Sequence, residues 1–370
     1  MQEAKPRVLL LQNLIKDYRV PIYNYIAERY DFTVAYTDRD QSVQSCRFNK
    51  WRLDTRKVGP FKFVDFGTWR KILGYDAVIV LCDFYSLYDI ALPFVARKAA
   101  IVSWGIGMRA SYTRAYDLAR KHTFGDHLVR FVYDKCDANV FYMSKTKEFW
   151  AGTKLKQHKI FIAPNTTAVE PIVVQNKSKK DLLFVGTLYK QKGVEQLLGA
   201  FKSALERVES SAKLHIVGDG NMMDELMRYV EQNGLASQVV FYGAIYDEKK
   251  LAELFQQSIL CISPCQAGLS VPKSMGYGVA FATQKNAITG GEIHHITNGV
   301  NGLLYDSSED LKPLLEDALL NSDVYLAMGE RAKEYYDNNA TPKMMAQGVI
   351  DAVDFALANK KDRSCRNFYK

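Results

Sequence analysis

The sequence predicts an α/β protein with two doubly wound domains, each a parallel sheet covered by helices. The chain has 370 residues, and a single hydrophobic core rarely grows beyond about 250–300 residues, so two domains are expected. Short apolar, β-branched runs alternate with amphipathic segments of helical length, which is typical of parallel sheets with crossover helices. This alternation stops once, in a polar stretch at 166–180, and then starts again.

The first domain is predicted to span residues 1–165, and the polar stretch at 166–180 is the predicted linker. Two helices are expected, at 86–97 and 112–135, because these segments are long and amphipathic. Strands are expected at the short apolar runs 7–12, 32–36, 61–66, 77–81, 100–104, 138–142 and 159–163.

The second domain is predicted to span residues 181–340. Its strands are expected at 182–186, 213–218, 239–243, 258–263 and 279–283. The first strand leads into a helix whose apolar residues share one face: Val194, Leu197, Leu198, Phe201, Ala204 and Leu205. From Glu309 the pattern is helical to Ala358. Residues 341–370 are therefore predicted to form a C-terminal helix with a basic tail that frays after about residue 360.

Composition narrows the class of protein and its location. The net charge of +8 is uneven: residues 1–165 carry 27 Lys+Arg against 16 Asp+Glu, whereas residues 166–370 carry 22 against 25. A basic first half suggests an anionic partner or surface. The six cysteines show no CxxC pair, which favours reduced thiols in a cytoplasmic protein and no metal site. No run approaches the ~18–20 apolar residues of a membrane span, and the apolar core at the N-terminus is too short for a signal peptide.

The segment 182–205 contains the strongest motif, a strand, a lysine-containing loop and a helix. Gly186 allows a sharp turn after the strand, and Gly193 leaves the helix N-terminus open. Lys190 and Lys192 stand just before that helix. Free backbone amides, the positive end of the helix dipole and an ammonium group together suit a diphosphate.

Two further glycine turns lie between a strand and a helix. Gly218, Asp219 and Gly220 form the first turn, where glycine permits close backbone approach. In the second turn Gly268 precedes a helix start. The amides of Leu269 and Ser270 beside it are candidates to hold a phosphate or sugar hydroxyl groups.

Together these motifs form an ordered series in the second half of the chain: VGTLYKQKG (185–193), IVGDG (216–220), VVFYG (239–243), SPCQAGLSVPKSMGYG (263–278), GGE (290–292) and NGVNGLLY (298–305). This series resembles glycosyltransferase family four, the retaining enzymes of the GT-B fold, in its bacterial surface-polysaccharide branch. The resemblance covers roughly residues 135–340 and is architectural before that.

The resemblance implies two Rossmann-like domains that face an interdomain cleft, with the acceptor on the first and the nucleotide sugar on the second. It implies a metal-free, hexosyltransferase-type enzyme with no cofactor beyond its nucleotide-diphosphate sugar. Lys192 would stabilise the leaving diphosphate, and Arg109 would lie on a cleft loop. Thr187 and Glu292 fall at donor-binding positions.

The sequence also departs from the family pattern. The usual arginine after the first glycine is Thr187, so Lys190 is a candidate to supply part of its charge. The family's paired glutamates fall on Cys265 and Lys273. A lysine cannot accept the ribose hydrogen bonds that a carboxylate accepts. Either the donor is held through the backbone amides at 268–270, or donor turnover is lost.

Three other patterns in the sequence have more than one interpretation. Residues 105–110 match a dinucleotide fingerprint, but they follow a late strand and lack a ribose-binding acid. Asp38 and Asp40 imitate a metal site, although a solvated loop is favoured. The segment 43–73 interleaves basic and aromatic residues, which suits an anionic membrane surface, nucleic acid or a solvated loop over a core. We favour the membrane and expect no nucleic-acid partner.

The sequence therefore predicts a glycosyltransferase that moves a sugar to a glycan or polyprenyl-linked acceptor in surface-polysaccharide biosynthesis. It would be cytoplasmic, or peripheral on the inner face of the plasma membrane. Two alternatives remain open: a catalytically silent binding or scaffold subunit, and an enzyme with a soluble acceptor.

Overall fold

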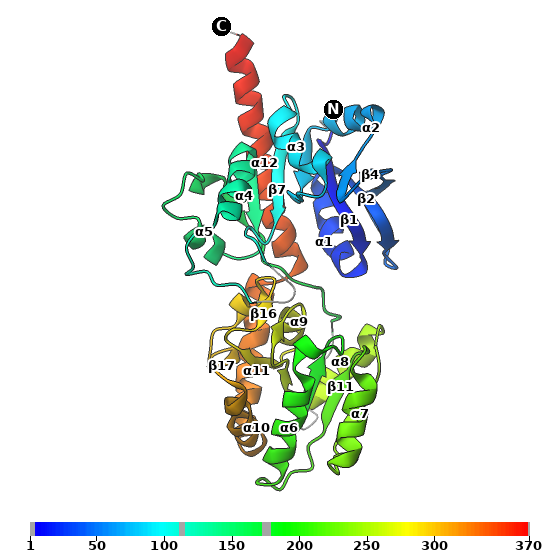
Figure 1. Ribbon diagram of the computed structural model, residues 1–370, viewed down its shortest axis with the longest axis vertical. Coiled ribbons are helices and arrows are strands. Elements are labelled where there is room, and N and C mark those ends of the chain that lie inside the picture. The colour runs from blue at the N-terminus through cyan, green and yellow to red at the C-terminus, as the bar shows by residue number, and fades with distance from the viewer. Residues whose placement is uncertain (1–3, 111–114, 172–178, 369–370) are drawn as a thin grey trace. The chain divides into compact units, whose positions relative to one another are not determined.

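A computed structural model describes residues 4–110, 115–171 and 179–368, with side chains up to residue 360. The chain forms two compact units (Figure 1). Unit 1 comprises residues 1–109, 117–165 and 342–370, and unit 2 comprises residues 110–116 and 166–341. Each unit contains a parallel sheet, so the predicted α/β class with two doubly wound domains is confirmed.

The described part of unit 1 has a seven-stranded sheet in the order β3-β2-β1-β6-β7-β8-β9, and all its pairs are parallel. The strands are β1 (Arg7–Lys16), β2 (Asp31–Gln41), β3 (Asn49–Arg52), β6 (Ala77–Val80), β7 (Ala100–Gly105), β8 (Ala138–Phe141) and β9 (Ile160–Ile162). Strand order reverses between β1 and β6. A short antiparallel hairpin, β4 (Arg56–Val58) and β5 (Phe61–Phe63), lies outside this sheet.

The helices of unit 1 are α1 (Val20–Arg29), α2 (Phe66–Leu73), α3 (Leu87–Val95), α4 (Phe124–Lys135), α5 (Lys145–Phe149) and α12 (Pro342–Phe368). The last of these comes from the end of the chain and packs beside β7 (Figure 1). Its buried residues Met345, Val349 and Val353 recur at helical spacing and join the core formed by β1, β7 and α1. The C-terminal helix therefore completes the hydrophobic core of unit 1.

The described part of unit 2 has a six-stranded parallel sheet in the order β12-β11-β10-β13-β15-β17. The strands are β10 (Asp181–Val185), β11 (Leu214–Val217), β12 (Val239–Phe241), β13 (Ser258–Ile262), β15 (Ala280–Gln284) and β17 (Gly302–Tyr305), with a separate pair β14 (Gln266–Ala267) and β16 (Ile288–Thr289). The helices are α6 (Val194–Leu205), α7 (Met223–Gln232), α8 (Glu248–Gln257), α9 (Ser270–Gly276), α10 (Leu311–Leu320) and α11 (Ser322–Asn339).

Short 3₁₀ turns connect several of these elements: η1 (Asp17–Arg19), η2 (Gln157–Lys159), η3 (Lys190–Lys192), η4 (Glu292–His295) and η5 (Ser308–Asp310). In unit 2 the strand order reverses between β10 and β13, because the chain adds β11 and β12 on one side and β13, β15 and β17 on the other. Ligands of doubly wound sheets bind outside the carboxyl ends of the strands at such a reversal.

Several predicted boundaries were wrong. The helix expected at 112–135 begins only at Phe124, because Thr123 and Asp126 form a capping box there; residues 111–114 lie outside the described residues. The strand expected at 61–66 ends at Phe63, since Asp65 caps α2 by accepting the Thr68 N–H.

Three other expectations concern a loop, the C-terminal tail and the linker. Asp38 and Asp40 lie in β2 rather than in a loop. The tail does not fray at residue 360, because α12 continues to Phe368. Residues 172–178 of the predicted linker lie outside the described residues. Among the helices that the structure describes, none is long and apolar enough to cross a membrane.

Candidate functional site

The predicted donor residues gather at the strand-order reversal of unit 2. Gly186 follows β10, Gly218 follows β11, and the Ser263–Gly268 loop follows β13. These three loops meet at the carboxyl edge of neighbouring strands. The sequence motifs are therefore brought to the part of a doubly wound sheet that usually binds a ligand.

The first two loops touch backbone to backbone. A Cβ atom on Gly218 would lie 1.8 Å from the carbonyl oxygen of Gly186, and φ at Gly218 is +147°. The Leu188 N–H donates to the carbonyl of Asp219 at 2.9 Å, which ties the loops together. Glycine is required at 218 because any side chain would separate the loops. Asp219 itself is exposed and accepts the N–H of Gly220 at 2.7 Å.

Lys192 lies at the end of η3, directly before α6, and is only 8% exposed. Its Nζ lies beside Gly186, since a Cβ on that glycine would be 3.2 Å from it. Among the described residues the Nζ atom makes no hydrogen bond and no ion pair, and its ring neighbour Tyr189 is 6.0 Å away. Burial lowers the pKa of Lys192 to about 8, against the opposing effects of Glu292 and Cys261.

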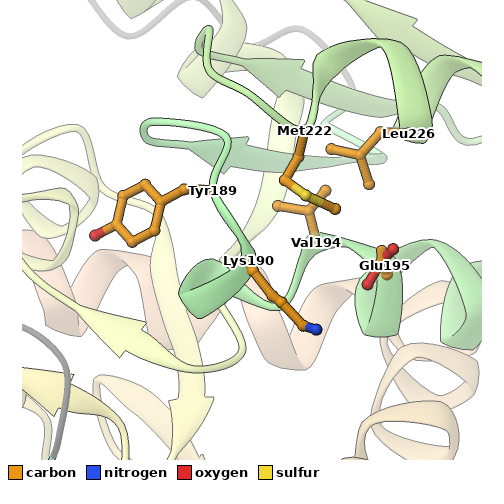
Figure 2. A pocket seen from close by; sticks show the side chains of 6 residues that line it. All are labelled: Tyr189, Lys190, Val194, Glu195, Met222 and Leu226. Carbon is orange, nitrogen blue, oxygen red and sulfur yellow. The ribbon is translucent and has the colours of Figure 1, made fainter.

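Lys190 is exposed and does not join Lys192. It lines a separate shallow pocket with Tyr189, Val194, Glu195, Met222 and Leu226. Figure 2 shows its side chain on the same side of the loop as Glu195, while Tyr189 points the opposite way. The two lysines stand two residues apart in a 3₁₀ turn of about three residues per turn, so they point in different directions. Thr187 is exposed on the same loop.

The third loop is held against Glu292 by the small β14–β16 pair. This pair aligns Ala267 with Thr289, which places Gly268 at the end of one strand and Gly290 at the end of the other. Glu292 is 4% exposed, and its Oε2 accepts the N–H of Gly290 at 2.7 Å and the Thr289 hydroxyl at 3.1 Å. A fixed carboxylate therefore lies near the Lys192 ammonium.

Ser270 begins α9 and carries an unsatisfied polar group. Its Oγ is buried and has no hydrogen-bond partner among the described residues. Leu269 and Ser270 stand where first-turn amides have no acceptor within a helix. Buried hydroxyl groups in folded proteins are usually satisfied, so the Ser270 hydroxyl and the amides beside it are candidate donors to a ligand.

Lys273 is engaged by unit 2 itself. Its Nζ lies 2.5 Å from Glu248 Oε1, and the Tyr277 hydroxyl donates to Glu248 Oε2 at 3.2 Å. Cys265 is half-buried, and burial raises the pKa of its thiol. The Cys265 sulfur leaves no room for a side chain at Gly193, because a Cβ there would lie 2.6 Å from Sγ. The φ of +72° at Gly193 also favours glycine. Neither position offers an ionised carboxylate.

Sequence reasoning missed Tyr116. Residues 110–116 belong to unit 2, and the Tyr116 hydroxyl lies 3.5 Å from His294 Nε2. Burial, and next the charge of Glu292, raise the pKa of Tyr116. Tyr116 therefore lies close to His294 and Glu292 in the candidate site. The predicted helix at 112–135 hid it, because a helical pattern gives no reason to expect a loop residue at a ligand site.

Arg109 lies in unit 1, after β7, and its side chain is exposed. Lys192 lies in unit 2, so the placement of Arg109 on a loop facing the donor site stays a prediction. The neighbouring glycine segment is also not a nucleotide turn. The Gly107 carbonyl accepts the Trp150 Nε1–H at 2.7 Å, and among the residues described between β7 and Phe124 no helix begins. A dinucleotide fingerprint requires a helix directly after the glycine turn. No cluster of three metal-binding side chains occurs among the described residues.

Comparison with known proteins agrees with this geometry. A family model described as Glycosyl transferases group 1 matches residues 165–335. An uncharacterized glycosyltransferase of Methanocaldococcus jannaschii is 31% identical over 166 residues, covering 44% of this chain and 39% of that protein. The chain thus aligns with about two fifths to one half of the length of the curated relatives it matches.

Solved structures resemble nearly the whole chain. Anabaena HepE in complex with UDP and glucose has a TM-score of 0.66 at 14% identity, covering 94% of this chain and 99% of HepE. WaaG, a glycosyltransferase involved in lipopolysaccharide biosynthesis, has a TM-score of 0.64 at 16% identity, with 93% and 99% covered. The chain therefore has the two-domain fold of the GT-B glycosyltransferases, and its residues 165–335 match the glycosyl transferases group 1 model.

Proposed function

We propose that the protein is a retaining glycosyltransferase that moves a sugar from a nucleotide-diphosphate sugar to a glycan or polyprenyl-linked acceptor in surface-polysaccharide biosynthesis. One observation carries this proposal: Lys192 is 8% exposed, makes no hydrogen bond or ion pair among the described residues, and stands at the strand-order reversal of unit 2. A buried cation without a partner is costly unless an anion binds to it. The diphosphate of a sugar nucleotide supplies that anion.

Lys192 and the N-terminus of α6 would hold the diphosphate, and the α9 amides with Ser270 would hold the sugar or a phosphate oxygen. As the bond to the sugar breaks, negative charge grows on the diphosphate. Fixed donors aimed at that charge lower the barrier without reorganising. The complex of HepE with UDP and glucose supports UDP as the first nucleotide to test.

The test is calorimetric titration of UDP, GDP and ADP in the presence of a chelator, followed by hydrolysis of the matching nucleotide sugar without acceptor. Metal-free binding at Lys192 predicts that one nucleotide binds under these conditions. A strict requirement for a divalent cation would contradict the proposed donor site.

Unit 1 would bind the acceptor and attach to an anionic membrane through residues 43–73, at the cytoplasmic face. The β4–β5 hairpin supports this attachment because it exposes Val58 (66%) and Phe61 (40%) beside Arg56 and Lys57. Phe66, at the start of α2, is 76% exposed. Apolar side chains between basic ones suit the boundary between head groups and acyl chains.

Not all of the segment can serve in this role. Phe48 is 7% exposed and belongs to the core, and Lys50 pairs with Asp40 at 2.7 Å. The informative variant therefore changes Arg52, Arg56 and Lys57 to Ser, and we call it the hairpin variant. If it leaves vesicle binding intact, residues 43–73 are only a solvated face and do not attach the protein to the membrane.

A catalytically silent nucleotide-binding subunit is the second candidate. It is favoured by the Lys273–Glu248 ion pair and by the protonated thiol of Cys265, since neither offers the sugar a carboxylate. Donor hydrolysis separates the two functions. A silent subunit would bind a nucleoside diphosphate and leave every nucleotide sugar intact.

A further inference from the structure

Helix α4 has an apolar face that the core of unit 1 does not use. Phe124, Leu128 and Phe131 follow one another at i, i+4 and i+7, so they form one stripe along the helix. They are 78%, 44% and 51% exposed, whereas Val132 and Tyr133 on the inner face are 4% and 7% exposed. The inner face already supplies the packing that holds α4 on the sheet.

The end of α3 extends this stripe. Phe94 is 46% exposed and Val95 is 47% exposed, and the Phe94 and Phe131 ring centroids lie 5.4 Å apart. We call the five residues Phe94, Val95, Phe124, Leu128 and Phe131 the α3–α4 patch. Single exposed apolar residues are common on soluble proteins, but a contiguous group on two neighbouring helices indicates an interaction surface.

Basic residues flank the two helices of the patch in the sequence. Arg97 and Lys98 follow α3, Lys121 precedes α4, and Lys135 ends it; all four are exposed and have no carboxylate partner among the described residues. The Lys135 ammonium lies 5.6 Å from the centroid of the Phe131 ring. A long basic side chain beside an aromatic ring can keep its charge at a polar boundary while the ring enters an apolar layer.

The acidic residues of α4 do not offset this charge, because arginines neutralise them. Asp126 is buried and pairs with Arg120 at 2.5 Å, and Asp134 pairs with Arg130 at 2.7 Å. The surface offered to a partner is therefore apolar and positive. A second copy of this chain would bring like charges together across the contact, whereas an anionic lipid surface complements both the charge and the apolar stripe.

We propose that the α3–α4 patch is a membrane-insertion surface that places Phe124 and Phe131 at the acyl boundary of an anionic bilayer. It is separate in sequence from the β4–β5 hairpin and does not depend on the proposed transfer reaction. Stable attachment of a peripheral protein generally takes more than one signal. The capping box of Thr123 and Asp126 fixes the first turn of α4, so Phe124 is presented from a rigid element.

The test measures insertion directly. Phe124→Trp is mixed with vesicles of phosphatidylglycerol and phosphatidylcholine that carry brominated acyl chains, and tryptophan quenching is compared with wild type. The matched control is Val324→Trp, which replaces an apolar residue of unit 2 that is 55% exposed. We expect extra quenching for Phe124→Trp and none for Val324→Trp. Equal quenching in both variants, or none in vesicle-bound Phe124→Trp, would overturn the proposal.

The double variant Phe124→Ser with Phe131→Ser tests affinity. Losing two exposed phenylalanines from the acyl boundary should weaken vesicle binding about tenfold to a hundredfold. Its melting temperature and nucleoside diphosphate affinity should stay at wild-type values, so failure here is distinguishable from failure of the donor site. If the variant instead abolishes a concentration-dependent dimer in sedimentation and still binds vesicles, the occupant is a second copy and the proposal is wrong.

Discussion

The lowered pKa of Lys192 predicts that nucleotide affinity falls as the pH rises. Its pKa in the free protein is about 8, lowered by burial. A bound diphosphate favours the charged ammonium and raises this pKa toward the ordinary lysine value of about 10.4. Affinity should therefore fall as the pH rises through 8, because binding must then take up a proton.

The magnitude follows from the protonated fraction. With a pKa of about 8 the free ammonium is about nine tenths protonated at pH 7 and about one tenth at pH 9, so affinity should fall about tenfold over this range. Calorimetry at pH 7, 8 and 9 in two buffers of different ionisation enthalpy measures both the affinity and the proton uptake. Working above pH 7 keeps the nucleotide ionised, since a phosphate has its second pKa near 6.

Lys192→Ala should lower affinity at pH 7 by about tenfold to a hundredfold, the usual cost of removing a charged hydrogen-bond partner, and should abolish the pH dependence. Lys190→Ala is the matched control, because Lys190 is exposed and lines a different pocket. A Lys192→Ala protein that binds as tightly as wild type, or that keeps the same fall between pH 7 and pH 9, would refute the assignment.

Three further outcomes are expected. Lys273→Glu should lower the melting temperature and gain no donor affinity, because the new carboxylate would face Glu248. Adding Glu248→Lys should restore the melting temperature. Tighter donor binding by the single variant would contradict this expectation. Burial raises the pKa of Asp89 from 3.8 to about 7, so the free energy of unfolding should fall as the pH rises from about 4 to about 7. Urea titrations should show that Asp89→Asn removes this dependence on pH. The hairpin variant should lose binding to anionic vesicles at 0.1 M salt, where the Debye length is ~10 Å, and differ little from wild type at 1 M, where it is ~3 Å.

Much of the fold could be predicted because parallel strands buried on both faces have a distinct sequence pattern. Ala77–Val80 is a continuous apolar run, Leu214–Val217 is apolar except for His215, and every residue in both is buried. The position of α12 could not be predicted in the same way. Its apolar spacing at Met345 and Val349 shows that one face is buried, but the spacing does not say which unit supplies the partner.

In the candidate site, too, features with a local cause could be predicted and features that depend on tertiary packing could not. Gly186 and Gly218 could be found because a close approach of two backbones requires glycine, and that requirement is local. The different directions of Lys190 and Lys192 depend on a 3₁₀ turn that no periodicity reveals. The position of Tyr116 depends on the path of the chain, and the partner of Lys273 depends on the packing of α8 against α9.

The departures from the pattern of the resembled glycosyltransferase family would make the proposed donor site richer in hydrogen-bond donors. Where the family has two carboxylates, this chain has a thiol whose pKa is raised by burial and a lysine neutralised by Glu248. Ser270 and the first amides of α9 are donors, and Glu292 is already bonded to Gly290. In the proposed donor site the surroundings of the sugar would therefore be rich in hydrogen-bond donors and poor in acceptors. A sugar with its own acceptors, such as a carboxylate or an amide carbonyl, satisfies these donors better than a neutral hexose, whose hydroxyl protons would lack partners.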